Sequence, residues 1–254
     1  SKGKKSRVVG GLGLLSMLAL VTPVHAASIG LRIDNGASKP TNLISNYNNV
    51  QVTPVFDPYI QRGINVTDNS LLNFSNGTVN VDMTKGAVGG SAQAPIGIYL
   101  DGSAINASNH VNINNTTINV TGPKGAIGID DNDLNTVNLN NVTFNVSGLQ
   151  GSTTGYEQYT YYRCASKTPC STRVVTAKGK NVMNVSNTNT DGNAIGWYSA
   201  GYPGMPSVTN LSGTSITNIA TGGKATPYGY YAGSNGNIHF KDATLSGTSN
   251  GKNG

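Results

Sequence analysis

The stretch VNINNTTINVTG, from Val111 to Gly122, returns after 26 residues as VNLNNVTFNVSG, from Val137 to Gly148. Both copies alternate apolar and polar residues, which is typical of a β-strand with one buried face. The side chains expected to point inward in the first copy are Val111, Ile113, Ile118 and Val120. A repeated strand at a fixed distance indicates a repeat architecture.

A second, shorter phrase also recurs, and it consists of an apolar residue, a glycine and another apolar residue. Its copies are QAPIGIY from Gln93, KGAIGID from Lys124, GNAIGWY from Gly192 and ATPYGYY from Ala225. One repeat unit therefore holds at least two short strands, and units that cannot bury an apolar face alone must stack on their neighbours. We predict an all-β, right-handed parallel β-helix of roughly eight coils.

The coils should place equivalent apolar residues one above another. From the spacing of the breaks that contain Asn or Ser, we expect this column to contain Phe74, Ile113, Leu139, Val185, Leu211 and Phe240. Asparagine tolerates the left-handed conformation that sharp corners require. Asparagines in register can also bond to one another in ladders between coils.

The composition agrees with many short strands joined by turns. The 254 residues include 33 glycines, and only 11% are charged. Low charge with abundant Gly, Asn, Ser and Thr could also suit a disordered chain, but disordered chains lack regularly placed Val, Ile and Leu. A β-sandwich or barrel is the other all-β possibility, although neither requires repeated phrases.

Residues 1–26 are predicted to be a secretory signal peptide. A basic start precedes an apolar run from Val8 to Val21, and small residues lead to a cleavage site after Ala26. Loss of this segment removes four positive charges and lowers the net charge from +6 to +2. A nearly neutral protein gives no electrostatic reason to expect nucleic-acid binding. Residues 27–60 repeat poorly and are predicted to form an amino-terminal cap, followed by the β-helix over 61–254.

The segment 150–180 loses the alternation and is predicted to be a loop insertion. In an exported protein its two cysteines, Cys164 and Cys170, are expected to form a disulfide. Loops on a rigid scaffold commonly bind partners, and exposed Tyr and Arg are favoured contacts. The candidate binding residues are Tyr156, Tyr159, Tyr161, Tyr162 and Arg163; alternatively, the loop covers the side of the helix. Two cysteines and three histidines make a poor zinc site, and neither a metal nor a cofactor is expected.

The signal peptide, the Asn- and Gly-rich coils and the closely spaced cysteines resemble the passenger region of a bacterial autotransporter (type V secretion). The resemblance implies export through the periplasm and display on the outer membrane, or release, by means of a carboxy-terminal β-barrel. On this interpretation the sequence is an amino-terminal fragment. The resemblance implies adhesion or self-association, with a host-cell or bacterial surface protein or glycan as partner.

Two other functions remain open: a structural stalk and a secreted polysaccharide-degrading enzyme of the pectin-cleaving type. The tetrapeptide Asn189-Thr190-Asp191-Gly192 resembles one motif of pectin-cleaving glycoside hydrolases, and an acidic cluster lies at Asp130, Asp131 and Asp133. In those enzymes the paired aspartates follow the first motif, whereas here they precede it, and the remaining motifs are absent. We therefore interpret these aspartates as turn residues and expect no enzymatic activity.

Overall fold

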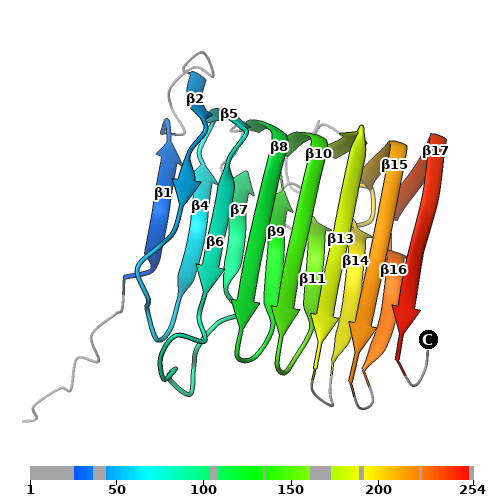
Figure 1. Ribbon diagram of the computed structural model, residues 1–254. Helices are drawn as coiled ribbons and strands as arrows, with labels where there is room; N and C mark the ends of the chain where they lie inside the picture. Colours follow the sequence, from blue (N-terminus) through cyan, green and yellow to red (C-terminus); the bar gives the residue numbers. More distant parts are fainter. Residues whose placement is uncertain are drawn as a thin grey trace, which may run out of the picture.

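The computed structural model describes residues 26–36, 44–102, 108–133, 135–160, 173–188, 192–222 and 225–251. Within these residues all regular structure is β, arranged as two long sheets that lie face to face (Figure 1). No helix in this part of the chain is long and apolar enough to cross a membrane.

Sheet A contains one short strand from each coil. Its strands, in spatial order, are β1 (Ser28–Asp34), β4 (Gln61–Thr67), β7 (Ile96–Gly102), β9 (Ala126–Asp133), β11 (Thr153–Tyr159), β14 (Asn193–Ala200) and β16 (Thr226–Ala232).

Sheet B contains the longer half of each coil. Its strands are β2 (Ile44–Asn48), β3 (Gln51–Val52), β5 (Leu71–Ser75), β6 (Thr78–Asp82), β8 (Asn109–Gly122), β10 (Asn135–Gly148), β12 (Arg173–Lys178), β13 (Lys180–Asn187), β15 (Ser207–Thr221) and β17 (Gly236–Asn250).

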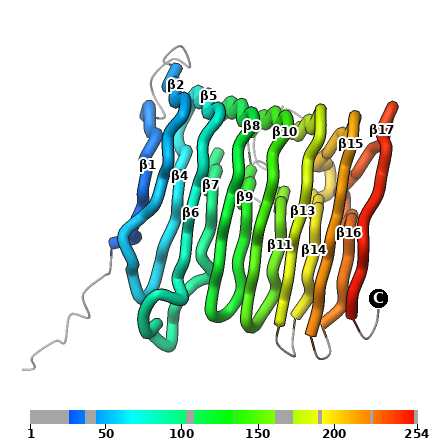
Figure 2. The backbone as a smooth tube through the Cα atoms, in the orientation of Figure 1, coloured from blue at the N-terminus to red at the C-terminus, as the bar shows by residue number. Residues whose placement is uncertain are grey.

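All pairings between the named strands are parallel, and they join each coil to the next one along the chain. The chain thus alternates between the two sheets and advances by one strand in each, which Figure 2 shows as a steady progression from blue to red. Seven such coils lie within the described residues, and they form the predicted parallel β-helix. The cap predicted for residues 27–60 is itself coil-like, because β1, β2 and β3 pair in register with the second coil.

The core lies between the two sheets, and the inward residues predicted for the first repeat are all fully buried there. The predicted column from Phe74 to Phe240 is correct except at one position. Val185 pairs with Val146 and Ile219 on the other half of sheet B, and Ala177 occupies the place assigned to it.

A corner divides each coil of sheet B into two halves. The residue at this corner has a positive φ, which most residues avoid but Asn and Gly tolerate. The corner residues are Asn49, Asn76, Asn115, Asn141, Gly179, Gly213 and Asp242. The predicted role of asparagine at corners is therefore confirmed.

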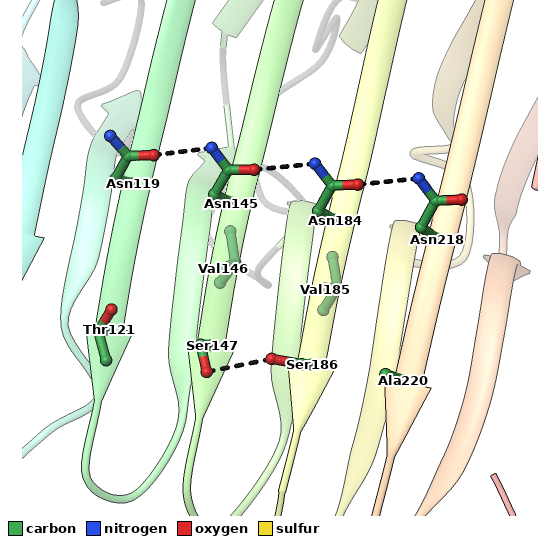
Figure 3. A pocket seen from close by; sticks show the side chains of 10 residues that line it. All are labelled: Asn119, Thr121, Asn145, Val146, Ser147, Asn184, Val185, Ser186, Asn218 and Ala220. Carbon is green, nitrogen blue, oxygen red and sulfur yellow. Dashed lines mark hydrogen bonds between the residues drawn. The ribbon is translucent and has the colours of Figure 1, made fainter. Parts of the chain in front are cut away.

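Asparagine ladders run across the outward face of sheet B, as predicted. In the longest ladder, each side-chain amide donates to the carbonyl oxygen of the preceding coil at 2.7–2.9 Å. Its members are Asn80, Asn119, Asn145, Asn184 and Asn218, of which Figure 3 shows the last four. The ladder thus adds side-chain hydrogen bonds to the backbone hydrogen bonds that join neighbouring coils.

Asn145→Ala should lower the free energy of unfolding by about 1 kcal/mol, because it removes two solvent-facing hydrogen bonds of the ladder. Denaturant unfolding of both variants would measure the loss. Asn210→Ala is the matched control, since Asn210 faces outward on β15 and has no ladder bond to the described residues. Equal losses in the two variants would contradict a stabilising role for the ladder.

A column of glycines crosses sheet A, with one glycine in each coil. Its members are Gly30, Gly63, Gly97, Gly128, Gly155, Gly196 and Gly229. In all but the last coil, an added Cβ would lie within 3.0 Å of the carbonyl oxygen of the next glycine in the column. Close approach of the backbones therefore requires glycine here, which explains the recurring apolar-Gly-apolar phrase.

Candidate functional site

The second residue after each column glycine points away from the core, because the residues on either side of it point inward. In five consecutive coils these outward residues are in register, and each is either a tyrosine or an acidic residue. They are Tyr99, Asp130, Glu157, Tyr198 and Tyr231. We call this set the tyrosine–carboxylate row; it runs along the helix axis on the outward face of sheet A.

Two carboxyl groups lie next to each other at the centre of the row. Asp130 of β9 is paired in register with Glu157 of β11, and both side chains are half-buried. Burial raises the pKa of Asp130 to about 6, although its bond from Asn132 and the positive charge of Arg62 act in the opposite direction. Burial, and then the charge of Asp130, raises the pKa of Glu157 to about 7. At neutral pH the pair can therefore hold a proton.

Two polar residues next to the row, Asn132 and Arg62, hold side chains of the row in place. The Asn132 side-chain amide donates to Asp130 Oδ1 at 2.8 Å. Asn132 itself is only 5% exposed, and its Oδ1 accepts no hydrogen bond from the described residues. On the other side, the Arg62 guanidinium lies 3.8 Å from the centre of the Tyr99 ring and donates to Asn65 Oδ1. This cation–π contact fixes the position of the Tyr99 ring.

Tyrosine rings form a platform at the other end of the row. The rings of Tyr198 and Tyr231 stack with their centres 5.5 Å apart, and Tyr228 meets Tyr231 edge to face. Burial and the nearby charge of Glu157 raise the pKa of Tyr198, so its hydroxyl stays protonated. The row thus places flat aromatic surfaces on both sides of the two carboxyl groups.

Asp131 belongs to the interior, although it directly follows Asp130. Its carboxylate accepts hydrogen bonds from Tyr156 Oη and Asn135 Nδ2, both at 2.7 Å. Burial raises its pKa to about 7. The predicted acidic cluster is therefore divided: Asp130 faces outward, Asp131 faces inward, and only Asp133, with φ of 65°, occupies a corner. The turn interpretation is wrong for Asp130 and Asp131, because both lie inside β9, whereas Asp133 is its last residue.

The predicted binding loop is also divided by the structure. Tyr156 lies in β11 and is fully buried against Trp197, so it is a core residue and not an exposed contact. Tyr159 lies at the end of β11 on the same outward face as Glu157. The strands β11 and β12 also show that much of 150–180 belongs to the coils. The remaining candidates, Tyr161, Tyr162, Arg163, Cys164 and Cys170, lie outside the described residues, as does Asp191 of the pectinase-like motif.

The outward face of sheet B offers a second, weaker candidate. A shallow groove of about 420 Å³ runs between the Asn119–Asn218 part of the ladder and a parallel line of small side chains (Figure 3). Its amides bond to one another along the ladder, and Ser186 donates to Ser147. The groove has no charged or aromatic side chain. These polar groups are already used for coil stacking, so the row on sheet A is the better candidate.

The described residues contain no group of three His, Cys, Asp or Glu side chains arranged to hold a metal ion. Comparison with protein-family models, curated proteins and solved structures gave no match.

Proposed function

We propose that this β-helix is a secreted or surface-displayed recognition protein of the adhesin type, and that it binds a glycan along the tyrosine–carboxylate row. The observation that supports this most directly is the row itself, in which carboxyl groups lie between aromatic rings. Sugar rings present C–H faces that pack on aromatic faces, and their hydroxyls donate to carboxylates. A row that crosses five coils suits a chain of sugars better than a single small molecule.

The charges in and around the row favour a neutral glycan over an anionic one. Asp130 and Glu157 carry partial negative charge near neutral pH, and the charge of Asp101 also acts on Asp130. The nearby cation, Arg62, is engaged with the Tyr99 ring and Asn65. A polyuronate would bring like charges together, which disfavours binding.

Tyr198→Ala should weaken binding of a neutral oligosaccharide about ten-fold, because it removes a central stacking surface, an effect of about 1.4 kcal/mol. The measurement is isothermal titration calorimetry with cellohexaose, xylohexaose and chitohexaose, and with oligogalacturonate as the anionic comparison.

Phe240→Ala is the matched control, because Phe240 is an exposed aromatic residue on sheet B. It should bind as the unmodified protein does. Binding of oligogalacturonate in preference to the neutral sugars, or full affinity in Tyr198→Ala, would contradict the proposal. Cell adhesion without binding to any of these sugars would point to a protein partner.

A further inference from the structure

We propose that Asp130 and Glu157 are the catalytic pair of a retaining glycoside hydrolase, which cleaves the glycan held along the row. This inference rests on the glycan binding proposed above and assigns a reaction to the same site. It departs from the expectation of a non-enzymatic passenger, and it uses carboxyl groups other than Asp191.

The spacing of the two strands that carry the carboxyl groups suits this reaction. They occupy paired positions on neighbouring parallel strands, which lie about 4.8 Å apart, and both face outward. Retaining glycosidases hold their two carboxyl groups about 5–5.5 Å apart, whereas inverting enzymes need several ångström more to admit a water molecule. Adjacent coils of a β-helix therefore hold the two residues at a backbone spacing close to the retaining distance.

The aromatic residues would place the scissile bond over this pair. Tyr99 precedes Asp130 in the row, and Tyr198 follows Glu157. Tyr99 and Tyr198 are three strand spacings apart, about 14 Å, which is more than the length of one sugar unit. A glycan that runs along the helix axis can thus rest one sugar on each ring, with the sugars between them, and the bond to be cleaved, over the carboxyl groups. The stacked Tyr231 extends the surface for a further sugar on the Tyr198 side.

The surroundings of the two carboxyl groups assign their roles. Asp130 receives the Asn132 amide hydrogen on Oδ1 and lies in the field of Arg62, and both favour its ionised form. Its Oδ2 is the nucleophile. Glu157 is described without such a donor or cation, so it retains its proton more readily and acts as the acid. The Oδ1 of Asn132, on the amide that orients Asp130, is buried and has no partner among the described residues.

The reaction takes two displacements. In the first, Asp130 Oδ2 bonds to the anomeric carbon, the bond from that carbon to the glycosidic oxygen breaks, and the Glu157 proton moves to this oxygen. The leaving sugar then carries a hydroxyl, and the other sugar is an ester of Asp130. In the second, Glu157 takes a proton from water, the water oxygen bonds to the anomeric carbon, and the ester bond breaks. The Asp130 carboxylate and the Glu157 carboxylic acid are thereby restored.

The test uses the neutral hexasaccharides named above, with products separated by chromatography and the anomeric configuration followed by proton NMR. We expect shortened oligosaccharides whose new reducing end first has the configuration of the bond cleaved. Asp130→Asn and Glu157→Gln should each lower kcat by at least 100-fold, with KM changed only a few-fold. Asp242→Asn is the control, because Asp242 lies at a corner of β17 where the positive φ also suits Asn.

Two further measurements distinguish a catalytic role from a structural one. Glu157→Gln should still cleave an aryl glycoside with a good leaving group, which needs no acid. Asp130→Gly with azide should yield the glycosyl azide of inverted configuration. Tyr198-dependent binding without hydrolysis would overturn this inference and leave the proposed function intact. Unchanged cleavage in Asp130→Asn would also overturn the inference, and absence of both binding and cleavage would overturn both proposals.

Discussion

Gly128→Ala should destabilise the β-helix by about 3 kcal/mol, near the upper end of the usual cost of an overpacked core. The new Cβ would lie 2.3 Å from the Gly155 carbonyl oxygen and 2.8 Å from Cδ1 of Phe144. Neither neighbour can move freely, because the strand that carries Gly155 is hydrogen-bonded on both sides and the Phe144 ring is fully buried. Thermal unfolding followed by circular dichroism should show a lower Tm, on the order of 10 °C.

Two glycines provide matched controls for this variant. Gly229 belongs to the same column, but its added Cβ would find Thr217 Oγ1 at 3.0 Å and no backbone atom within 4 Å among its nearest contacts. Gly90 is exposed, and nothing lies within 4 Å of its added Cβ. Alanine at either position should change Tm by no more than a few degrees. A similar loss for Gly128 and Gly229 would mean that contact between coils is not the reason for glycine.

Much of this fold could be predicted from the sequence because each coil must match its neighbours. The alternation in Val111–Gly122 identifies the buried face, and the recurring phrase with glycine identifies the strands of sheet A. The error at Val185 arose because spacing alone was used to align the coils. The corner of that coil is formed by Gly179, whereas the corner of the preceding coil is formed by Asn141. The sequence therefore has no asparagine that marks the corner next to Ala177.

Of the candidate site, only Asp130 is singled out by the sequence, as one of three acidic residues interpreted as turn residues, because the site depends on register between coils. Asp130 and Glu157 are separated in the sequence, and only the alignment of Gly128 with Gly155 brings them side by side. The signal was present in TTGYEQ, from Thr153, which repeats the glycine phrase with threonine in place of the first apolar residue. The sequence nevertheless predicts a loop for this segment, because the long insertion that follows hides its regularity.

The protein should become less stable as the pH rises from about 4 to about 7, a direction opposite to that of proteins stabilised by ionised carboxylates. The principal cause is Asp131, which lies inside the coil and is 2% exposed. Burial raises its pKa to about 7, and the charge of Asp130 acts in the same direction; bonds from Tyr156 and Asn135, and the charge of Arg173, only partly oppose the shift.

The sign follows from proton binding. An aspartate in the unfolded chain loses its proton near pH 3.9, whereas Asp131 in the folded protein keeps it to about pH 7. Between these values the folded state binds more protons, so its stability falls as the pH rises. The stabilisation is complete below about pH 4 and is lost by about pH 7. A shift of about three units corresponds to about 4 kcal/mol, an order-of-magnitude figure. Asp130 and Glu157 shift in the same direction and should steepen the trend.

Asp131→Asn isolates this contribution. Asparagine can still accept the Asn135 amide hydrogen, and its own amide can donate to Tyr156 Oη, so both buried hydrogen bonds are retained without a titrating group. Denaturant unfolding at half-unit intervals from pH 4 to pH 8 should give a much flatter profile for this variant, whereas Asp242→Asn should retain the slope of the unmodified protein. If Asp131→Asn kept the full slope, the proton would reside on another group, and the outward pair Asp130 and Glu157 would be the next to test. A flat profile in the unmodified protein would instead mean that water reaches Asp131 inside the coil and holds its pKa near the ordinary value.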